Sequence, residues 1–183
     1  KDNKLQFTRL SGDFDNLKEI VYGMYRDALK TEGDFVVNDT NTKPVIPKNK
    51  RIYIGSYINP DLEYTLEIPE GCELAFGRNG KLGPNVTIRL NNTAIIASPN
   101  QQIFNDCKII GKFKCPFIPV EWFGAKGDGI TDDSKAINTC FLYAGRTTVL
   151  LSAERYLAKS TIRIDEEECN MNNTEDESYM NDG

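Results

Sequence analysis

Histidine is absent from the 183-residue sequence, and none of its five cysteines forms a CxxC pair. Without histidine the chain lacks the commonest general base and the commonest metal ligand, which excludes Ser–His–Asp and Cys–His catalysis within it. The cysteines are Cys72, Cys107, Cys115, Cys140 and Cys169. Because an odd number without paired spacing fits neither a disulfide framework nor a zinc site, we expect buried free thiols and predict no cofactor.

Long apolar runs and clusters of positive charge are missing as well. No apolar stretch approaches the roughly 20 residues that span a bilayer. The 22 Lys and Arg residues are scattered and are outnumbered by 27 Asp and Glu, for a net charge of −5, whereas nucleic-acid binding needs a basic stripe. We therefore predict neither membrane insertion nor nucleic-acid binding. Because the chain begins with Lys rather than Met, we interpret it as a processed product or a piece of a longer polypeptide.

The first 50 residues are expected to contain one helix and a linker. Apolar residues recur at three- and four-residue steps over 13–30, which is typical of an amphipathic helix. A short helix of this kind is not stable alone, so its apolar stripe needs a partner. We therefore predict an attachment or oligomerisation helix through Leu17, Ile20, Val21, Met24 and Leu29. Residues 34–50 are rich in Asn, Thr, Pro and Lys and are interpreted as a connector.

From residue 51 the pattern changes to short apolar or alternating pieces separated by Gly, Pro and Asn. Strands are predicted over 51–54, 64–68, 73–76, 86–90, 94–97, 102–104 and 108–113. Short strands at this spacing indicate an all-β sandwich, barrel or solenoid, and periodicity does not choose among them.

A second helix is predicted over about 132–144. Its buried face contains Ala136, Ile137, Cys140, Phe141 and Ala144, and a glycine follows at the stop position. Further strands are predicted over 148–151, 156–158 and 161–164. Residues 165–183 carry eight acidic side chains and almost no apolar ones, so a flexible tail or surface excursion is expected.

The stretch EWFGAKGDGITDD, residues 121–133, places the only tryptophan beside three glycines and three aspartates. It has neither the dinucleotide fingerprint nor the P-loop spacing, and its aspartates would repel a phosphate. Asp128, Asp132 and Asp133 offer oxygen ligands for calcium, but not with the spacing of a helix–loop–helix site. The adjacent Asp132 and Asp133 are also candidates for paired catalytic carboxylates, although neighbours at a helix start usually point in different directions.

A structural turn is the interpretation we favour for this stretch. Thr131 or Asp132 is expected to cap the second helix, and both aspartates at its start complement the helix dipole. The glycines permit positive φ, and the aromatic pair is expected to anchor the turn in apolar surface. The predicted junction residues are Trp122, Phe123, Gly124, Gly127, Asp128, Gly129, Thr131, Asp132 and Asp133. No catalytic or metal-binding residue is assigned.

Residues 122–137, WFGAKGDGITDDSKAI, resemble a motif of the pectate-lyase-like right-handed β-helix superfamily. That group includes polygalacturonases, exo-acting glycoside hydrolases and bacteriophage tailspikes. The resemblance implies that this segment leads into a short helix capping the N-terminal end of a β-helix. Residues 149–151 and 156–157 are similar to the first coil, written V-x-L/F-P-x-G-x-Y, although residues 152–155 lack its usual Pro and Gly.

The upstream residues 68–76, 92–95 and 102–104 resemble a β-rich module that precedes this motif in proteins of gut Bacteroidales and their phages, crAss-like phages among them. The two resemblances together cover about 64–164. In the family the catalytic residues lie on later coils, so none is carried over to this chain and its enzymatic status stays open. A β-helix needs several stacked coils, so more polypeptide or another chain is expected beyond the first.

The expected fold is mainly β. It consists of an N-terminal helix and linker (1–50), a β-rich solenoid or sandwich-like module (51–120), the β-helix motif with its capping helix and first coil of a right-handed parallel β-helix (121–164), and an acidic tail (165–183). The expected function is the particle-proximal part of a phage tailspike or tail fibre in the virion. The expected partners are two further copies in a homotrimer, other tail proteins and, through a distal region, host surface polysaccharide.

Two alternatives remain open from the sequence. The chain is either a fragment of a secreted polysaccharide lyase or glycoside hydrolase of the same fold, or a bacterial carbohydrate-binding or adhesion module. In the last case exposed aromatics such as Tyr53, Tyr57 and Tyr64 would stack on sugars, although tyrosines on strands are more often ordinary packing.

Overall fold

The structure is a computed structural model that describes residues 33–37 and 44–164. The helix expected over 13–30, with Leu17, Ile20, Val21, Met24 and Leu29, lies outside the described residues. The acidic segment 165–183 and Cys169 lie outside them too.

The described part of the chain is mainly β with one α-helix, which confirms the expected class at that level. The helix is α2 (Ser134–Ala144), preceded by the 3-10 helix η1 (Val120–Phe123). The strands are β1 (Phe35–Val37), β2 (Arg51–Ile54), β3 (Tyr57–Ile58), β4 (Tyr64–Glu67), β5 (Glu73–Phe76), β6 (Lys81–Leu82), β7 (Val86–Ile96), β8 (Lys108–Phe113), β9 (Phe117–Pro119), β10 (Asp128–Asp132), β11 (Thr148–Leu150) and β12 (Arg155–Leu157).

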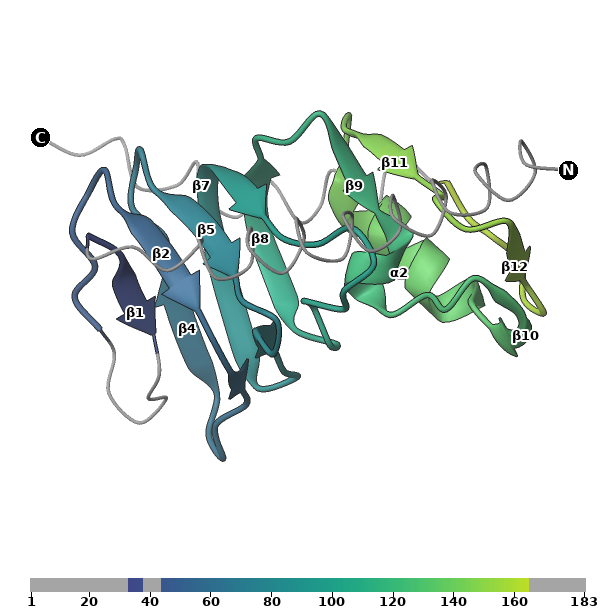
Figure 1. The fold of residues 1–183 in the computed structure, drawn as a ribbon, viewed down its shortest axis with the longest axis horizontal. Helices are drawn as coiled ribbons and strands as arrows, with labels where there is room; N and C mark the ends of the chain where they lie inside the picture. The colour runs from purple at the N-terminus through teal and green to yellow at the C-terminus, as the bar shows by residue number, and fades with distance from the viewer. Residues whose placement is uncertain (1–32, 38–43, 165–183) are drawn as a thin grey trace, which may run out of the picture.

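All strand pairs in the described residues are parallel. Strand β5 lies between β2 and β7, with Glu73 opposite Arg51 on one side and Ala94 on the other. In a second row, the first half of β7 lies between β4 and β8. Partner strands in these rows are about 22 residues apart in the sequence. Figure 1 shows the strands following one another along the long axis, with α2, β10 and β12 near one end.

The core is built from side chains that meet in register on successive strands. Leu66, Ile88 and Ile109 form one such ladder across β4, β7 and β8, and all three are buried. The alternating burial along β7, with Val86, Ile88 and Leu90 inside, is the period-two pattern that predicted this strand. Each buried aliphatic side chain contributes about 1.5–3 kcal/mol through removal from water, so the ladders dominate the stability of the fold.

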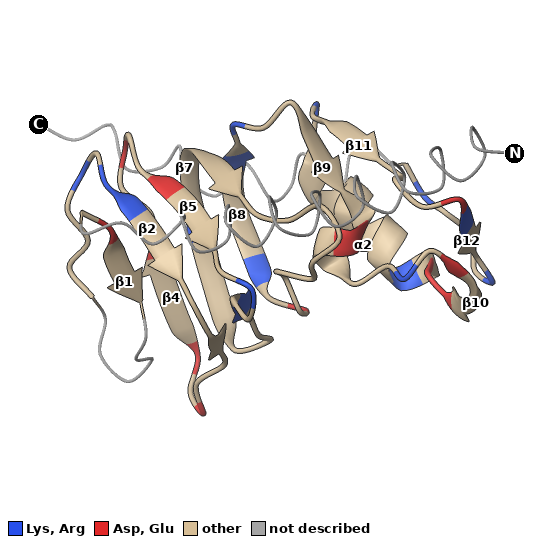
Figure 2. Ribbon diagram, in the orientation of Figure 1, with Lys and Arg blue, Asp and Glu red and all other residues tan. Residues whose placement is uncertain are grey.

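Charged residues lie outside the ladders. Arg51 on β2 is 3.6 Å from Glu73 on β5, and Arg89 on β7 is 3.6 Å from Glu67 on β4. Figure 2 shows charges of both signs dispersed along the ribbon rather than gathered on one element. Because such exposed pairs contribute at most about 1 kcal/mol each, they favour the strand register more than they stabilise the fold.

Several strands differ from the sequence-based expectation. Strand β1 lies inside the expected connector, and the two strands predicted at 86–90 and 94–97 form the single strand β7. Residues 102–104 contribute only an isolated bridge from Phe104 to Leu82. Very short strands such as β3, β6 and β9 were missed because hydrogen bonds to a distant parallel partner define them.

The strand predicted over 161–164 is irregular chain instead. The side chain of Asn138 on α2 donates to the carbonyl of Thr161 at 3.0 Å and accepts the N–H of Arg163 at 2.9 Å. These backbone groups are thereby bound to a side chain rather than to a neighbouring strand.

The cysteines of the described region are free thiols, as expected. Cys72, Cys107 and Cys140 are buried and Cys115 is half-buried. Burial raises the pKa of Cys107 to about 12, an effect opposed in part by its backbone hydrogen bond. A thiol with so high a pKa is not a nucleophile near neutral pH.

Candidate functional site

Trp122 anchors the segment that the sequence singled out. It lies in η1 and is 4% exposed. Its Nε1 donates to the carbonyl of Ser98 at 3.0 Å, and its own carbonyl accepts the N–H groups of Ile103 and Phe104 at 3.0 and 2.9 Å. The ring lies in the hydrophobic core, and these polar bonds dock η1 onto the preceding β-rich part.

Phe123 connects the β-rich part to the helix. Its ring centroid is 5.4 Å from that of Phe104 and 6.1 Å from that of Tyr143 on α2. Phe104 in turn meets Phe76 of β5 edge-to-face at 5.7 Å. Such pairs add about 0.5–1.5 kcal/mol each beyond burial, so an aromatic row holds the two parts in one core.

The glycine turn follows η1. Gly124, Gly127 and Gly129 have φ of 102°, 60° and 69°, the positive values expected for a turn. At Gly127 a Cβ atom would also lie 2.2 Å from the Cβ of Ala153. Glycine is therefore required there both by its backbone angle and by the close approach of the segment before β12.

Asp133 holds this turn against the start of α2. Its side chain is buried, at 1% exposed, and accepts the N–H groups of Lys126 at 2.6 Å and Gly127 at 3.1 Å. We expected Asp133 only to complement the helix dipole. The carboxylate instead points back to the turn and makes no side-chain hydrogen bond to the helix start.

Asp133 occupies the N-cap position of α2, and Asp132, the residue before it, supplies the side-chain cap that was expected from it or from Thr131. The Oδ1 of Asp132 accepts the N–H of Ser134 at 3.1 Å, the Ser134 hydroxyl at 2.5 Å and the N–H of Lys159 at 3.2 Å. The hydrogen bonds from the Ser134 hydroxyl, the Ser134 N–H and the Lys159 N–H lower the pKa of Asp132, in that order of size. Asp132 thus caps the first helical N–H and fixes residues after β12.

Asp128 makes a third and separate set of hydrogen bonds. Its carboxylate accepts the N–H groups of Thr131 at 2.7 Å and Ile130 at 2.8 Å, together with the Thr131 hydroxyl at 2.8 Å. These bonds lower the pKa of Asp128. Thr131 is therefore a partner of Asp128 rather than the helix cap.

The turn also contains strand β10, which the sequence did not predict. It is exposed and pairs in parallel with β12, with Asp128 opposite Arg155 and Asp132 opposite Leu157. Each of the three aspartates thus accepts hydrogen bonds from a different set of backbone N–H groups, rather than pairing with another aspartate. Within the described residues there is no group of three or more His, Cys, Asp or Glu side chains arranged to hold a metal ion.

Glu121 is a feature that sequence reasoning missed. This side chain in η1 is only 6% exposed, and its Oε1 accepts hydrogen bonds from the hydroxyls of Ser152, at 2.8 Å, and Tyr156. Its Oε2 is buried with no hydrogen-bond partner among the described residues. A glutamate is usually solvent-exposed, and no spacing in the sequence marks this one as buried.

The Glu121 charge affects its neighbours. Burial, and after it the charge of Glu121, raise the pKa of the Cys140 thiol to about 12. Burial and then the hydrogen bond to Glu121 raise the pKa of the Tyr156 hydroxyl. Both neighbours therefore stay protonated near neutral pH, so neither places a second negative charge beside the carboxylate.

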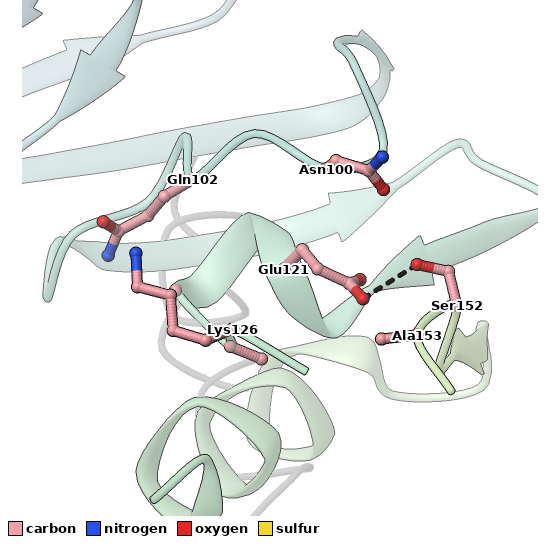
Figure 3. A pocket seen from close by; sticks show the side chains of 8 residues that line it. Asn100, Gln102, Glu121, Lys126, Ser152 and Ala153 are labelled. Atoms are coloured by element: carbon pink, nitrogen blue, oxygen red, sulfur yellow. Dashed lines mark hydrogen bonds between the residues drawn. The ribbon is translucent and has the colours of Figure 1, made fainter. Parts of the chain in front are cut away.

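A pocket of about 390 Å³ opens beside Glu121. Figure 3 shows its labelled side chains converging from three segments: the loop before Phe104, η1 with its following turn, and the turn before β12. These side chains are Asn100, Gln102, Glu121, Lys126, Ser152 and Ala153. The pocket walls are thus predominantly polar and carry one charge of each sign.

The chain matches no protein-family model, no curated protein and no solved structure. In the described residues, no helix has both the length and the apolar character needed to cross a membrane.

Proposed function

We propose that the chain is the particle-proximal part of a phage tailspike or tail fibre built on a right-handed parallel β-helix. The observation that carries this proposal is the strictly parallel pairing of described strands at a spacing of about 22 residues. A sandwich of hairpins pairs its strands antiparallel, whereas a solenoid stacks each coil in parallel on the one before. The spacing favours a solenoid.

In this proposal the coils begin well before residue 121. Strands β2, β5 and the end of β7 form one face, β4, the start of β7 and β8 a second face, and β3, β6 and Phe104 a third. The buried ladders along these faces are the stacks that a solenoid core requires. The turn at 124–133 and α2 then interrupt the stack, and β9–β11 pairing resumes beyond them.

The role in a virion rests on this architecture and on the resemblance of residues 122–137 to the β-helix superfamily. A shaft of stacked coils is rigid and extends from its attachment point, which suits a fibre that holds a distal region away from a particle. We infer that residues 13–30 attach or trimerise the chain and that a distal region binds or cleaves host surface polysaccharide. In this proposal the described segment has a structural role and catalyses no reaction.

The oligomeric state tests the first part of the proposal. If residues 13–30 trimerise the chain as proposed, light scattering of the full chain should give about three times the 20.6 kDa mass of one copy. The double substitution Leu17→Asp and Ile20→Asp should reduce that mass to one copy. Lys18→Asp, which lies off the apolar stripe, is the matched control. A stable monomer of the unmodified chain contradicts the proposal.

Location in particles tests the second part. Gold-labelled antibodies raised against the chain should bind the tail end of particles purified from a culture that encodes it. Label on the cell envelope or in the culture medium, with none on particles, would instead favour the secreted alternatives.

The enzyme alternative makes a different prediction. A fragment of a polysaccharide lyase or glycoside hydrolase would release new reducing ends from pectin-like or capsular glycans, and we expect none from this chain. For the adhesion alternative, Tyr64 is buried and therefore unable to stack on a sugar, whereas Tyr57 is 49% exposed. A glycan array with hits lost in Tyr57→Ala would favour that alternative.

A further inference from the structure

We propose that the pocket beside Glu121 binds a small zwitterion, a molecule that carries an ammonium and a carboxylate group, such as a free α-amino acid. The proposal rests on the pocket and its unpaired charges, and it does not depend on the role in a virion.

The first observation is a buried charge without a counter-charge. Glu121 is 6% exposed, and no Lys or Arg of the described residues forms an ion pair with it. Two hydroxyls bind Oε1, while Oε2 has no hydrogen-bond partner in the described part of the chain. Buried carboxylates are normally paired with a cation, because desolvation of an isolated charge is costly. An ammonium group from a ligand would supply the missing counter-charge to this carboxylate.

The second observation is a free cation on the opposite side of the same pocket. Lys126 lines the pocket, yet its ammonium forms no ion pair or hydrogen bond among the described residues. Its own backbone N–H is fixed by Asp133 at 2.6 Å, which holds the start of the side chain at the rim. Figure 3 shows Glu121 in η1 and Lys126 in the turn that follows it, with no bond drawn between their side chains. Lys126 is therefore placed to bind a carboxylate.

The remaining polar groups suit the rest of such a ligand. The amide of Asn100 makes no hydrogen bond to other described residues and has both donor and acceptor atoms for a polar side chain. A ligand that carries one charge leaves either Glu121 or Lys126 unpaired, and a neutral sugar leaves both unpaired. Opposite charges on one small molecule match both, and the pocket of about 390 Å³ has room for it.

Binding requires a small local change at Glu121. Oε2 is closed to solvent in this structure, so an incoming ammonium first meets Oε1 and the Ser152 hydroxyl. Ser152 is exposed, and its hydroxyl can turn to solvent when the ammonium takes its place. The Tyr156 hydroxyl would stay on the carboxylate and hold its orientation.

Fluorescence of the only tryptophan provides the test. Trp122 is adjacent to Glu121, and its Nε1 binds the carbonyl of Ser98, two residues before Asn100. The full chain is titrated with glycine, L-alanine and L-serine, and separately with acetate, methylammonium and D-glucose. We expect saturable changes with the amino acids, and binding of the three single-function probes at least about tenfold weaker, since each loses at least one charge contact.

Substitutions then separate the two charges. Glu121→Gln keeps the shape and an acceptor for Tyr156 but removes the charge, and Lys126→Met removes the cation from an exposed position. Each should weaken amino-acid binding at least about tenfold, because a charge-assisted hydrogen bond is lost. Lys112→Met, at a position outside the pocket, is the matched control and should bind as the unmodified chain does.

Three results would overturn the proposal. The first is that no amino acid produces a saturable change in fluorescence. The second is that glucose binds as tightly as the amino acids or more tightly. The third is that the Lys126→Met variant binds amino acids as tightly as the unmodified chain. If Glu121→Gln does not fold, as judged by its thermal melt, the Lys126→Met comparison decides alone.

Discussion

The carboxylate of Asp133 accepts the backbone N–H of Lys126 at 2.6 Å and that of Gly127 at 3.1 Å. The residue just before α2 thereby closes the turn that follows η1. Because Asp133 is buried, water does not compete for these bonds. The two segments of chain on either side of β10 are thus tied together by one side chain.

Replacing Asp133 should therefore destabilise the fold. Asp133→Ala leaves two backbone donors without their charged partner, and we expect the free energy of unfolding to fall by about 2–4 kcal/mol. Urea unfolding followed by circular dichroism measures it. Asp132→Ala, at an exposed neighbour, is the matched comparison and should cost less. An equal loss for the two variants would contradict the assigned roles.

The Glu121 cluster gives a second prediction. Tyr156→Phe removes a hydroxyl donor from a buried carboxylate, and we expect a loss of about 1–3 kcal/mol in the free energy of unfolding. Tyr53→Phe, at a half-buried tyrosine on β2 whose hydroxyl makes no hydrogen bond to a described residue, is the control for loss of a hydroxyl as such. Urea unfolding of both variants gives the two losses.

A double-mutant cycle identifies the cause of the Tyr156→Phe loss. If the hydroxyl acts through the carboxylate, the loss should shrink when the same substitution is made in a Glu121→Gln chain. An identical loss in both backgrounds would show that the two side chains are not energetically coupled.

Trp122 is expected to be the most sensitive single position of η1. Trp122→Ala removes a ring that is 4% exposed and should lower the free energy of unfolding by about 3–5 kcal/mol. Trp122→Phe keeps part of the ring but loses the bond to Ser98, so a smaller loss is expected. Denaturant midpoints of the three proteins would rank them, and an Ala variant as stable as the unmodified chain would show that the ring is not packed.

Gly111 should tolerate no side chain. Its φ is 98°, and a Cβ atom there would lie 1.9 Å from the carbonyl oxygen of Leu90 on β7. Gly111→Ala must therefore separate β8 from β7, and we expect a loss of soluble, folded protein or a midpoint far below that of the unmodified chain. Gly33→Ala is the control, since nothing lies within 4 Å of its added Cβ.

The stability of the fold should fall in acid. Hydrogen bonds lower the pKa of Asp128 and Asp132, so the folded chain binds fewer protons than the unfolded chain at low pH. The contribution of these two carboxylates to the free energy of unfolding is fully present above their pKa in the unfolded chain, about 3.9. It is lost as the pH falls through their lower pKa values in the folded chain. Urea midpoints measured from about pH 6 downward should decrease below about pH 4.

The double substitution Asp128→Asn and Asp132→Asn tests that assignment. It should flatten this acid dependence, because the amides do not titrate. Asp61→Asn, at an exposed position before β4, should leave the dependence unchanged. An unaltered slope in the double variant would assign the acid sensitivity to other groups.

Local patterns determined the elements with the strongest periodicity. The alternation through Val86 and Ile88, the stripe of Ala136, Ile137 and Cys140, and the turn glycines were all readable from the sequence. These features depend on neighbours two to four residues away, so a single sequence contains them. The β-rich class with one described helix followed from them.

The tertiary structure alone decided which strands pair, and that they pair in parallel, because hydrogen-bond partners about 22 residues apart leave no local signal. It also decided that Glu121 is buried under Ser152 and Tyr156, and that Asp133 binds the turn behind it. The sequence does not distinguish a carboxylate exposed to water from one that accepts hydrogen bonds from buried donors. That difference depends on how distant segments of the chain pack together.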